Sequence, residues 1–171
     1  MLFRSIKGAI DAADQLDDLA EKTGITGEAL GSLKYAGEVT GTPLESMAKG
    51  VQKLSINMAA AAGGGKEQAA VFQALGVSVK ALDGSLRGSD QVLGDIADRF
   101  ANFKDGPEKA ALAVELFGKA GADMIPLLNQ GSAGIKDLRA EADRLGISFG
   151  SDLASSAAEF NDNLKKIQLT S

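Results

Sequence analysis

The placement of glycine is the feature that most constrains how this chain can fold. Twenty-one glycines are spread along 171 residues, and three of them open the same local pattern: Gly24-Ile25-Thr26, Gly76-Val77-Ser78 and Gly146-Ile147-Ser148. Glycine suits the left-handed residue after a helix, the branched residue suits the contact that follows, and Thr or Ser can cap the next helix. Because these signals stop helices repeatedly, the sequence predicts several short helices and not one long rod.

Between these signals, apolar residues recur every three or four positions, which places them on one face of a helix. We therefore expect an all-α fold, a multi-helix bundle of about eight or nine short helices. The expected helices cover about 2–22, 27–39, 44–61, 66–75, 89–100, 107–117, 123–129, 132–145 and 152–167. The expected inward residues include Leu30, Leu33, Ala36, Leu44, Met47, Val51, Leu54, Met58, Phe72, Leu75, Val92, Leu93, Ile96, Phe100, Ala110, Val114, Phe117, Ile135, Leu138, Ala142 and Leu145.

Several helix starts carry sequence signals. Thr42-Pro43-Leu44-Glu45 has the pattern of a capping box, with Thr at the N-cap, Pro at the first helical position and Glu at the third. Ser89 and Ser132 are predicted caps of two later helices, and Pro107 opens another. One stretch is not helical in pattern: Val77 and Val79 alternate before a turn dipeptide, so residues 77–87 are compatible with a small β-hairpin.

Three consecutive glycines, Gly63, Gly64 and Gly65, must end the helix before them, because together they add a helix penalty of about 3 kcal/mol relative to alanine. They are the hinge candidates, and an ordinary loop is the alternative. We expect a single helical module over 1–171, with a sub-division at this linker. Residues 1–62 would form a helical hairpin region and residues 66–171 a second helical region.

Composition excludes several kinds of chemistry. The chain has no Cys and no His, so it has no thiolate nucleophile, no zinc finger and no imidazole base. Its 18 basic and 23 acidic side chains give a net charge of −5, and the sequence shows no basic cluster for nucleic acid. The longest uncharged runs, which include 54–65 and 124–135, have twelve residues each and are too short to span a bilayer. We expect no catalytic, cofactor-binding or metal-binding residues and no membrane segment.

One ordered set of segments resembles phage tail tape measure proteins. Its central segment is Leu116–Gly131, with Leu19–Ala36 before it, Phe72–Arg87 between them and Phe160–Asp162 at the end, so that the resemblance covers about 10–170. The motif residues are Leu116, Phe117, Gly118, Gly121, Ile125, Pro126, Leu127, Leu128, Asn129 and Gly131. By residue type alone, the same motif is a packed helical corner in which the glycines permit close approach or a turn and Pro126 starts or kinks a helix.

The resemblance implies a structural component of the virion tail, present in the host cytoplasm during assembly. Such a protein lies inside the tail tube, its length determines the tail length, and it meets tail tube protein, tail assembly chaperones and baseplate proteins. A helix of 171 residues reaches at most about 260 Å, whereas a tube of roughly 1,000 Å needs several hundred more residues. We therefore expect a fragment, a truncated prophage product or a module of a longer protein.

Two other classes remain as alternatives. The first is a non-catalytic helical adaptor or secreted substrate that binds partners, or itself, through amphipathic helices. The second is a carboxylate-based cell-wall hydrolase, which would need two separated acids facing one cleft. Flanking tail genes would favour the tape measure interpretation over the adaptor.

Overall fold

A computed structural model describes residues 17–146 of the chain, and the fold of that part is all-α, as the periodicity predicts. Residues 17–23 are helical and are followed by seven α-helices: α2 (Gly27–Thr40), α3 (Leu44–Ala62), α4 (Lys66–Leu75), α5 (Ser89–Asn102), α6 (Pro107–Phe117), α7 (Gly121–Leu128) and α8 (Gly131–Arg144). A short 3-10 helix, η1 (Gly118–Ala120), joins α6 to α7. Most of the first predicted helix, over 2–22, and all of the last, over 152–167, lie outside the described residues.

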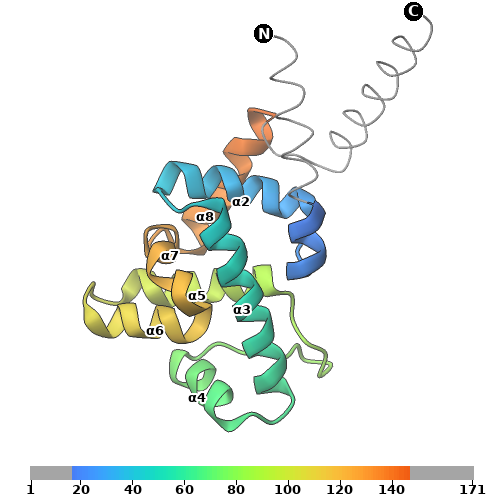
Figure 1. The fold of residues 1–171 in the computed structure, drawn as a ribbon, viewed down its shortest axis with the longest axis vertical. Helices are drawn as coiled ribbons and strands as arrows, with labels where there is room; N and C mark the ends of the chain where they lie inside the picture. The colour runs from blue at the N-terminus through green and yellow to red at the C-terminus, as the bar shows by residue number, and fades with distance from the viewer. Residues whose placement is uncertain (1–16, 147–171) are drawn as a thin grey trace, which may run out of the picture.

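Helix α3 runs through the middle of the molecule, with α2 across one end and α4 at the other (Figure 1). Its main neighbours are α4, α6 and α7, while α8 packs against α2 and α5. One hydrophobic core joins side chains from α2 to α8, so it spans both sides of the Gly63–Gly65 linker. Its largest fully buried members are Leu30, Leu33, Met47, Leu54, Met58, Leu93, Ile96, Phe100, Leu116, Phe117, Met124 and Leu127.

Gly24 and Gly76 end helices as predicted, but Ser78 does not cap a helix, and its hydroxyl donates to the Lys80 carbonyl (2.8 Å). Gly24 (φ 72°) ends the first helix, and the Thr26 hydroxyl accepts a hydrogen bond from the Ala29 N–H (3.2 Å) at the start of α2. Gly76 (φ 70°) ends α4, and the Val77 N–H donates to the Phe72 carbonyl (3.0 Å) while the Val77 side chain enters the core. The α4 boundaries, Lys66 and Leu75, coincide with the predicted ones.

The Gly63–Gly65 linker ends α3, as three glycines require. The Gly63 N–H donates to the Ala59 carbonyl (2.9 Å), the Gly65 N–H donates to the Ala60 carbonyl (2.8 Å), and Gly64 has a φ of 101° that favours glycine. These bonds satisfy carbonyls that the last turn of a helix leaves without partners. The hinge role of the three glycines stays a prediction.

The three predicted hydroxyl caps at Thr42, Ser89 and Ser132 are wrong. Helices α3, α5 and α8 begin without a side-chain cap hydrogen bond from their N-cap residues, Pro43, Gly88 and Gln130. The Thr42 hydroxyl instead donates to the Asp123 carbonyl (3.2 Å), and the Ser132 hydroxyl donates to the Asp98 carboxylate (2.7 Å). At Thr42 and Ser132, tertiary partners therefore replace the local bonds that the sequence pattern suggested.

The hairpin near 77–87 is reduced to one isolated antiparallel bridge, between Lys80 and Leu86, and no strand occurs within residues 17–146. The Arg87 N–H donates to the Val79 carbonyl (2.9 Å), and the Ala81 N–H donates to the Ser85 carbonyl (2.8 Å). Val77 cannot extend this ladder because its N–H already belongs to the cap of α4.

The predicted inner face of α6 is also wrong. Phe117 is buried as expected, but Val114 is 44% exposed and Ala110 is only half-buried. The buried residues are Lys109, Ala113, Leu116 and Phe117. Three alanines on this helix leave the direction of its apolar face ambiguous in sequence. Beyond α8, Leu145 is 58% exposed and not inward.

Candidate functional site

The candidate site is the Leu116–Gly131 motif, which forms the end of α6, all of η1 and α7, and the first residue of α8. We call these residues the corner. The structure brings the motif together as a packed unit: Leu116, Phe117, Gly121, Leu127, Leu128 and Gly131 are buried, Gly118, Ile125 and Asn129 are half-buried, and Pro126 is exposed. The corner is therefore built mainly of core side chains.

Two glycines make the corner sharp. Gly118, at the end of α6, has a φ of 74°, a backbone conformation that residues with a side chain rarely adopt. Gly121 begins α7 against α6, and a Cβ added there would overlap the Ala113 carbonyl group. Because a backbone group cannot rotate away as a flexible side chain can, Gly121 permits α6 and α7 to approach more closely than any other residue would.

One interpretation of the sequence was that Pro126 starts a helix, and the structure shows that it does not. It lies inside α7, where its ring nitrogen cannot donate the usual hydrogen bond to the preceding turn. The helix continues for only two residues beyond it, to Leu128. The Asn129 N–H then donates to the Ile125 carbonyl (2.8 Å), so the helix ends directly after the proline.

Helix α3 holds one end of the corner through Asn57. This side chain is 8% exposed, and its amide Nδ2 donates to the carbonyls of Glu115 (3.1 Å) and Leu116 (3.0 Å). Both carbonyls belong to the last turn of α6, where helical partners are lacking. Sequence reasoning missed Asn57, although a polar residue between Leu54 and Met58 in an apolar stripe was a signal.

The start of α3 and the residues just before it hold the middle of the corner. Thr42 and Ser46 contact Asp123 of α7: the Thr42 hydroxyl donates to its carbonyl, and the Ser46 hydroxyl donates to its carboxylate (3.1 Å). One helical turn further along, Gly50 leaves the space that the Met124 sulfur occupies, since a Cβ there would overlap it. The start and the middle of the corner are thus fixed to α3 and to the residues just before it by contacts between residues far apart in sequence.

A buried lysine in the first turn of α6 holds the α5–α6 loop beside the corner. Lys109 is 4% exposed, and its Nζ donates to the Phe103 carbonyl (3.1 Å) and to Asp105 Oδ1 (2.9 Å). This hydrogen bond, and the charge of Lys109, lower the pKa of the Asp105 carboxyl below its ordinary value. Asn129 Nδ2 lies 3.5 Å from the same oxygen, while its Oδ1 is buried without a hydrogen-bond partner among the described residues.

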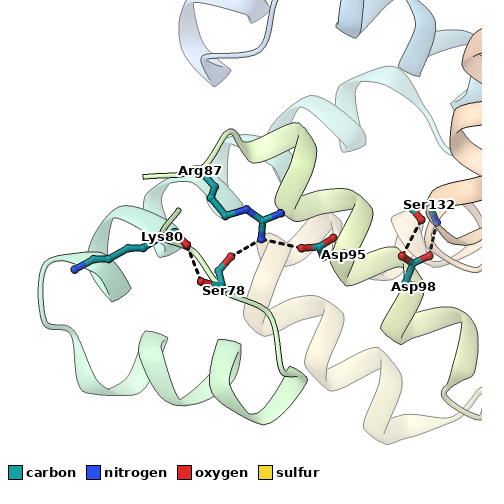
Figure 2. Close-up of polar contacts among 6 residues, drawn as sticks. All are labelled: Ser78, Lys80, Arg87, Asp95, Asp98 and Ser132. Atoms are coloured by element: carbon teal, nitrogen blue, oxygen red, sulfur yellow. Dashed lines mark hydrogen bonds and ion pairs between the residues drawn. The ribbon is translucent and has the colours of Figure 1, made fainter. Parts of the chain in front are cut away.

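Helix α5 holds the last residue of the corner and the first turn of α8. Asp98 Oδ1 accepts from the Ser132 N–H (2.7 Å), and its Oδ2 accepts from the Ser132 hydroxyl (2.7 Å), as Figure 2 shows. These two bonds, and secondarily the charge of Arg99, lower the pKa of the Asp98 carboxyl. Gly131, with a φ of 71°, directs the chain into α8 at this point.

Four carboxylates of the described region accept hydrogen bonds that favour their charged form. A general acid at neutral pH needs a raised pKa. The pKa values of Glu45, Asp83, Asp98 and Asp105 are instead lowered, each first by a hydrogen bond to the charged form. Within residues 17–146, no group of three or more acidic side chains is placed to hold a metal ion. No helix in that part of the chain combines the length and apolar character needed to cross a membrane.

No protein-family model matches the sequence, and comparisons with curated proteins and with solved structures return no match.

Proposed function

We propose that this chain is a structural component of a bacteriophage tail, a helical module of a tape measure protein that takes part in tail assembly and length determination. The proposal places it in the virion tail and, during assembly, in the bacterial host cytoplasm. Its proposed partners are the tail tube protein, tail assembly chaperones and baseplate proteins. We propose no catalysis and no cofactor.

The observation that carries the proposal is how the motif residues are used. The Leu116–Gly131 segment carries the resemblance most strongly. Its large apolar side chains pack in the core: Leu116, Phe117, Leu127 and Leu128 are buried. Two of the polar residues that meet it, Asn57 and Thr42, hydrogen-bond to its backbone. In this segment, hydrogen bonds to the backbone fix the position of the chain, and the side chains fill the core. Such a use of residues suits a structural role better than a catalytic one.

Tail composition tests this proposal. Mass spectrometry of purified, genome-free tails should detect peptides from 17–146, and cross-linking should join them to the tube subunit. Separated heads from the same particles serve as the control and should lack the peptides. Absence of the chain from purified tails would contradict the assignment.

Exposed leucines favour a second candidate, a non-catalytic helical adaptor. Leu82 is fully exposed at the tip of the 77–88 loop, and Leu86 in the same loop is 49% exposed. Apolar side chains at a loop tip are available to a partner protein. An adaptor would copurify with a host protein in cells that make no tails, whereas a tape measure module would not.

A further inference from the structure

Residues 66–88, which comprise α4 and the loop that follows it, supply few of the fully buried residues of the hydrophobic core. We call this segment the flap. It contributes Phe72, Leu75 and Val77 to the core, which is three of the 26 buried hydrophobic residues of the described chain. Its main helical neighbour is α3 alone, at the end of the molecule seen in Figure 1. Segments with few buried apolar contacts open at lower free energy than the core does.

The flap also lines one side of an open pocket. A cavity of about 260 Å³ lies between α4, α3 and α6, and its lining includes Phe72 from the flap, Asn57 from α3 and Leu116 from α6. The side of α4 that faces the corner therefore does not pack closely against it. Missing contacts across such a gap lower the cost of separating the two surfaces.

Both ends of the flap are glycines. Gly63–Gly65 precede it, and Gly88 joins it to α5. Glycine adopts backbone conformations that other residues do not, so the chain can turn at either end without breaking a helix. The three glycines of the first linker lie at the tip of α3, beyond its last helical residue, Ala62.

Among the described residues, Arg87 makes the side-chain hydrogen bond that joins the loop after α4 to the bundle. Arg87 Nη1 donates to the Ser78 carbonyl (2.7 Å) within the flap and to Asp95 Oδ2 (2.8 Å) on α5, as Figure 2 shows. The Arg87 and Asp95 side chains are 22% and 45% exposed, so water can compete for this bond. The other turn bonds of the loop, such as those from Ser85 to Asp83, stay inside the flap and do not resist its release.

We propose that the flap opens as one unit, rotating at Gly63–Gly65 and Gly88, while α3 and α5–α8 stay folded. The Arg87–Asp95 bond is the latch that holds it closed. Opening removes Phe72, Leu75 and Val77 from the core and uncovers the apolar surface of α3 beneath them. This opening is a property of the chain itself and does not depend on a role in phage tails.

Thiol labelling can test the proposal cleanly, because the chain has no Cys of its own. A single Val77→Cys variant reports on the flap, and Val51→Cys on α3 and Val92→Cys on α5 are matched controls. All three valines are buried, at 6%, 0% and 0% exposure. Under native conditions, the Val77→Cys thiol should react with Ellman's reagent at least about tenfold faster than either control, because opening of the flap precedes global unfolding.

Adding Arg87→Gln to each cysteine variant distinguishes the effect of losing the Arg87–Asp95 bond from the effect of a general loss of stability. The rate at Val77→Cys should rise several-fold, and the rates at Val51→Cys and Val92→Cys should stay the same. Equal labelling of all three cysteines, or equal acceleration of all three by Arg87→Gln, would overturn the proposal.

Hydrogen exchange on the unmodified chain gives the same test without a substitution. The amides of α4 should exchange together, at a lower free energy than those of α3 and α5. Exchange of α4 only at the free energy of global unfolding would overturn the proposal even if a cysteine variant failed to fold.

Discussion

Asp98 on α5 accepts two hydrogen bonds from Ser132 on α8, one from the backbone N–H and one from the hydroxyl, each 2.7 Å long. The carboxylate therefore occupies the place of an N-cap side chain, although it comes from another helix. Gln130, the N-cap residue of α8, makes no side-chain cap bond. The start of α8 thus depends on packing against α5 and not on a local cap.

Replacing Asp98 by Asn should destabilise the fold by about 1 kcal/mol, the usual value of a lost helix cap. The amide retains the shape of the carboxylate but presents one oxygen in place of two to the two Ser132 donors. The measurement is the midpoint of urea unfolding at neutral pH. Asp137→Asn, on the exposed face of α8, is the matched control and should leave the midpoint unchanged.

The same pair predicts a pH dependence. The pKa of Asp98 is lowered in the folded state, so its stabilisation is fully present above the unfolded-state value of about 3.9 and is lost as pH falls through the folded-state pKa. The free-energy difference between the original chain and Asp98→Asn should therefore shrink as pH is lowered from 6 to 2. A difference that stayed constant over this range would contradict the lowered pKa.

Asn57→Ala should destabilise the fold by about 2 kcal/mol, because the Glu115 and Leu116 carbonyls at the end of α6 lose their donor in a buried site. Asn57→Asp should cost more, since it places an acceptor against two acceptors. Gln52→Ala, on the exposed side of α3, controls for the change in helix propensity. Chemical denaturation of the three variants ranks them, and an Asn57→Ala midpoint equal to that of the control would show that the contact is unimportant.

The change in stability of three glycine-to-alanine variants should depend on which atoms the new Cβ contacts. Gly121→Ala overlaps the Ala113 backbone and should cost about 3 kcal/mol. Gly50→Ala overlaps the flexible Met124 side chain, which can move, and should cost about 1 kcal/mol. Gly94→Ala meets only the Ser132 Cβ at 3.6 Å and should stabilise α5 by about 0.5 kcal/mol. Thermal unfolding gives the order, and equal effects at all three sites would contradict the packing described for the corner.

The sequence correctly predicted helix boundaries and buried faces that depend on interactions between neighbouring residues. The boundaries of α4 follow from Gly65 on one side and Gly76 on the other, and both act through neighbouring backbone groups. The buried stripe of α5, with Val92, Ile96 and Phe100, follows from its regular spacing. Such features need no knowledge of the rest of the molecule.

Features that depend on distant partners were not predictable in the same way. Thr42 and Ser132 look like caps in sequence, and only the positions of Asp123 and Asp98 decide what their hydroxyls bind. The orientation of α6 depends on where Gly121 lets α7 approach Ala113. The support of the corner by Asn57 joins residues nearly sixty positions apart, which no local pattern encodes.

The length of assembled tails tests the central claim most directly. In a phage whose tape measure protein contains this module, deleting residues 27–146 in frame removes about 120 residues and should shorten the tail by up to about 180 Å if the segment is helical and extended in the tube. Duplicating the segment should lengthen the tail by a similar amount. Electron microscopy of both phages, beside the parent, gives the answer. Tails of parental length in both the deletion and the duplication would contradict a role in length determination.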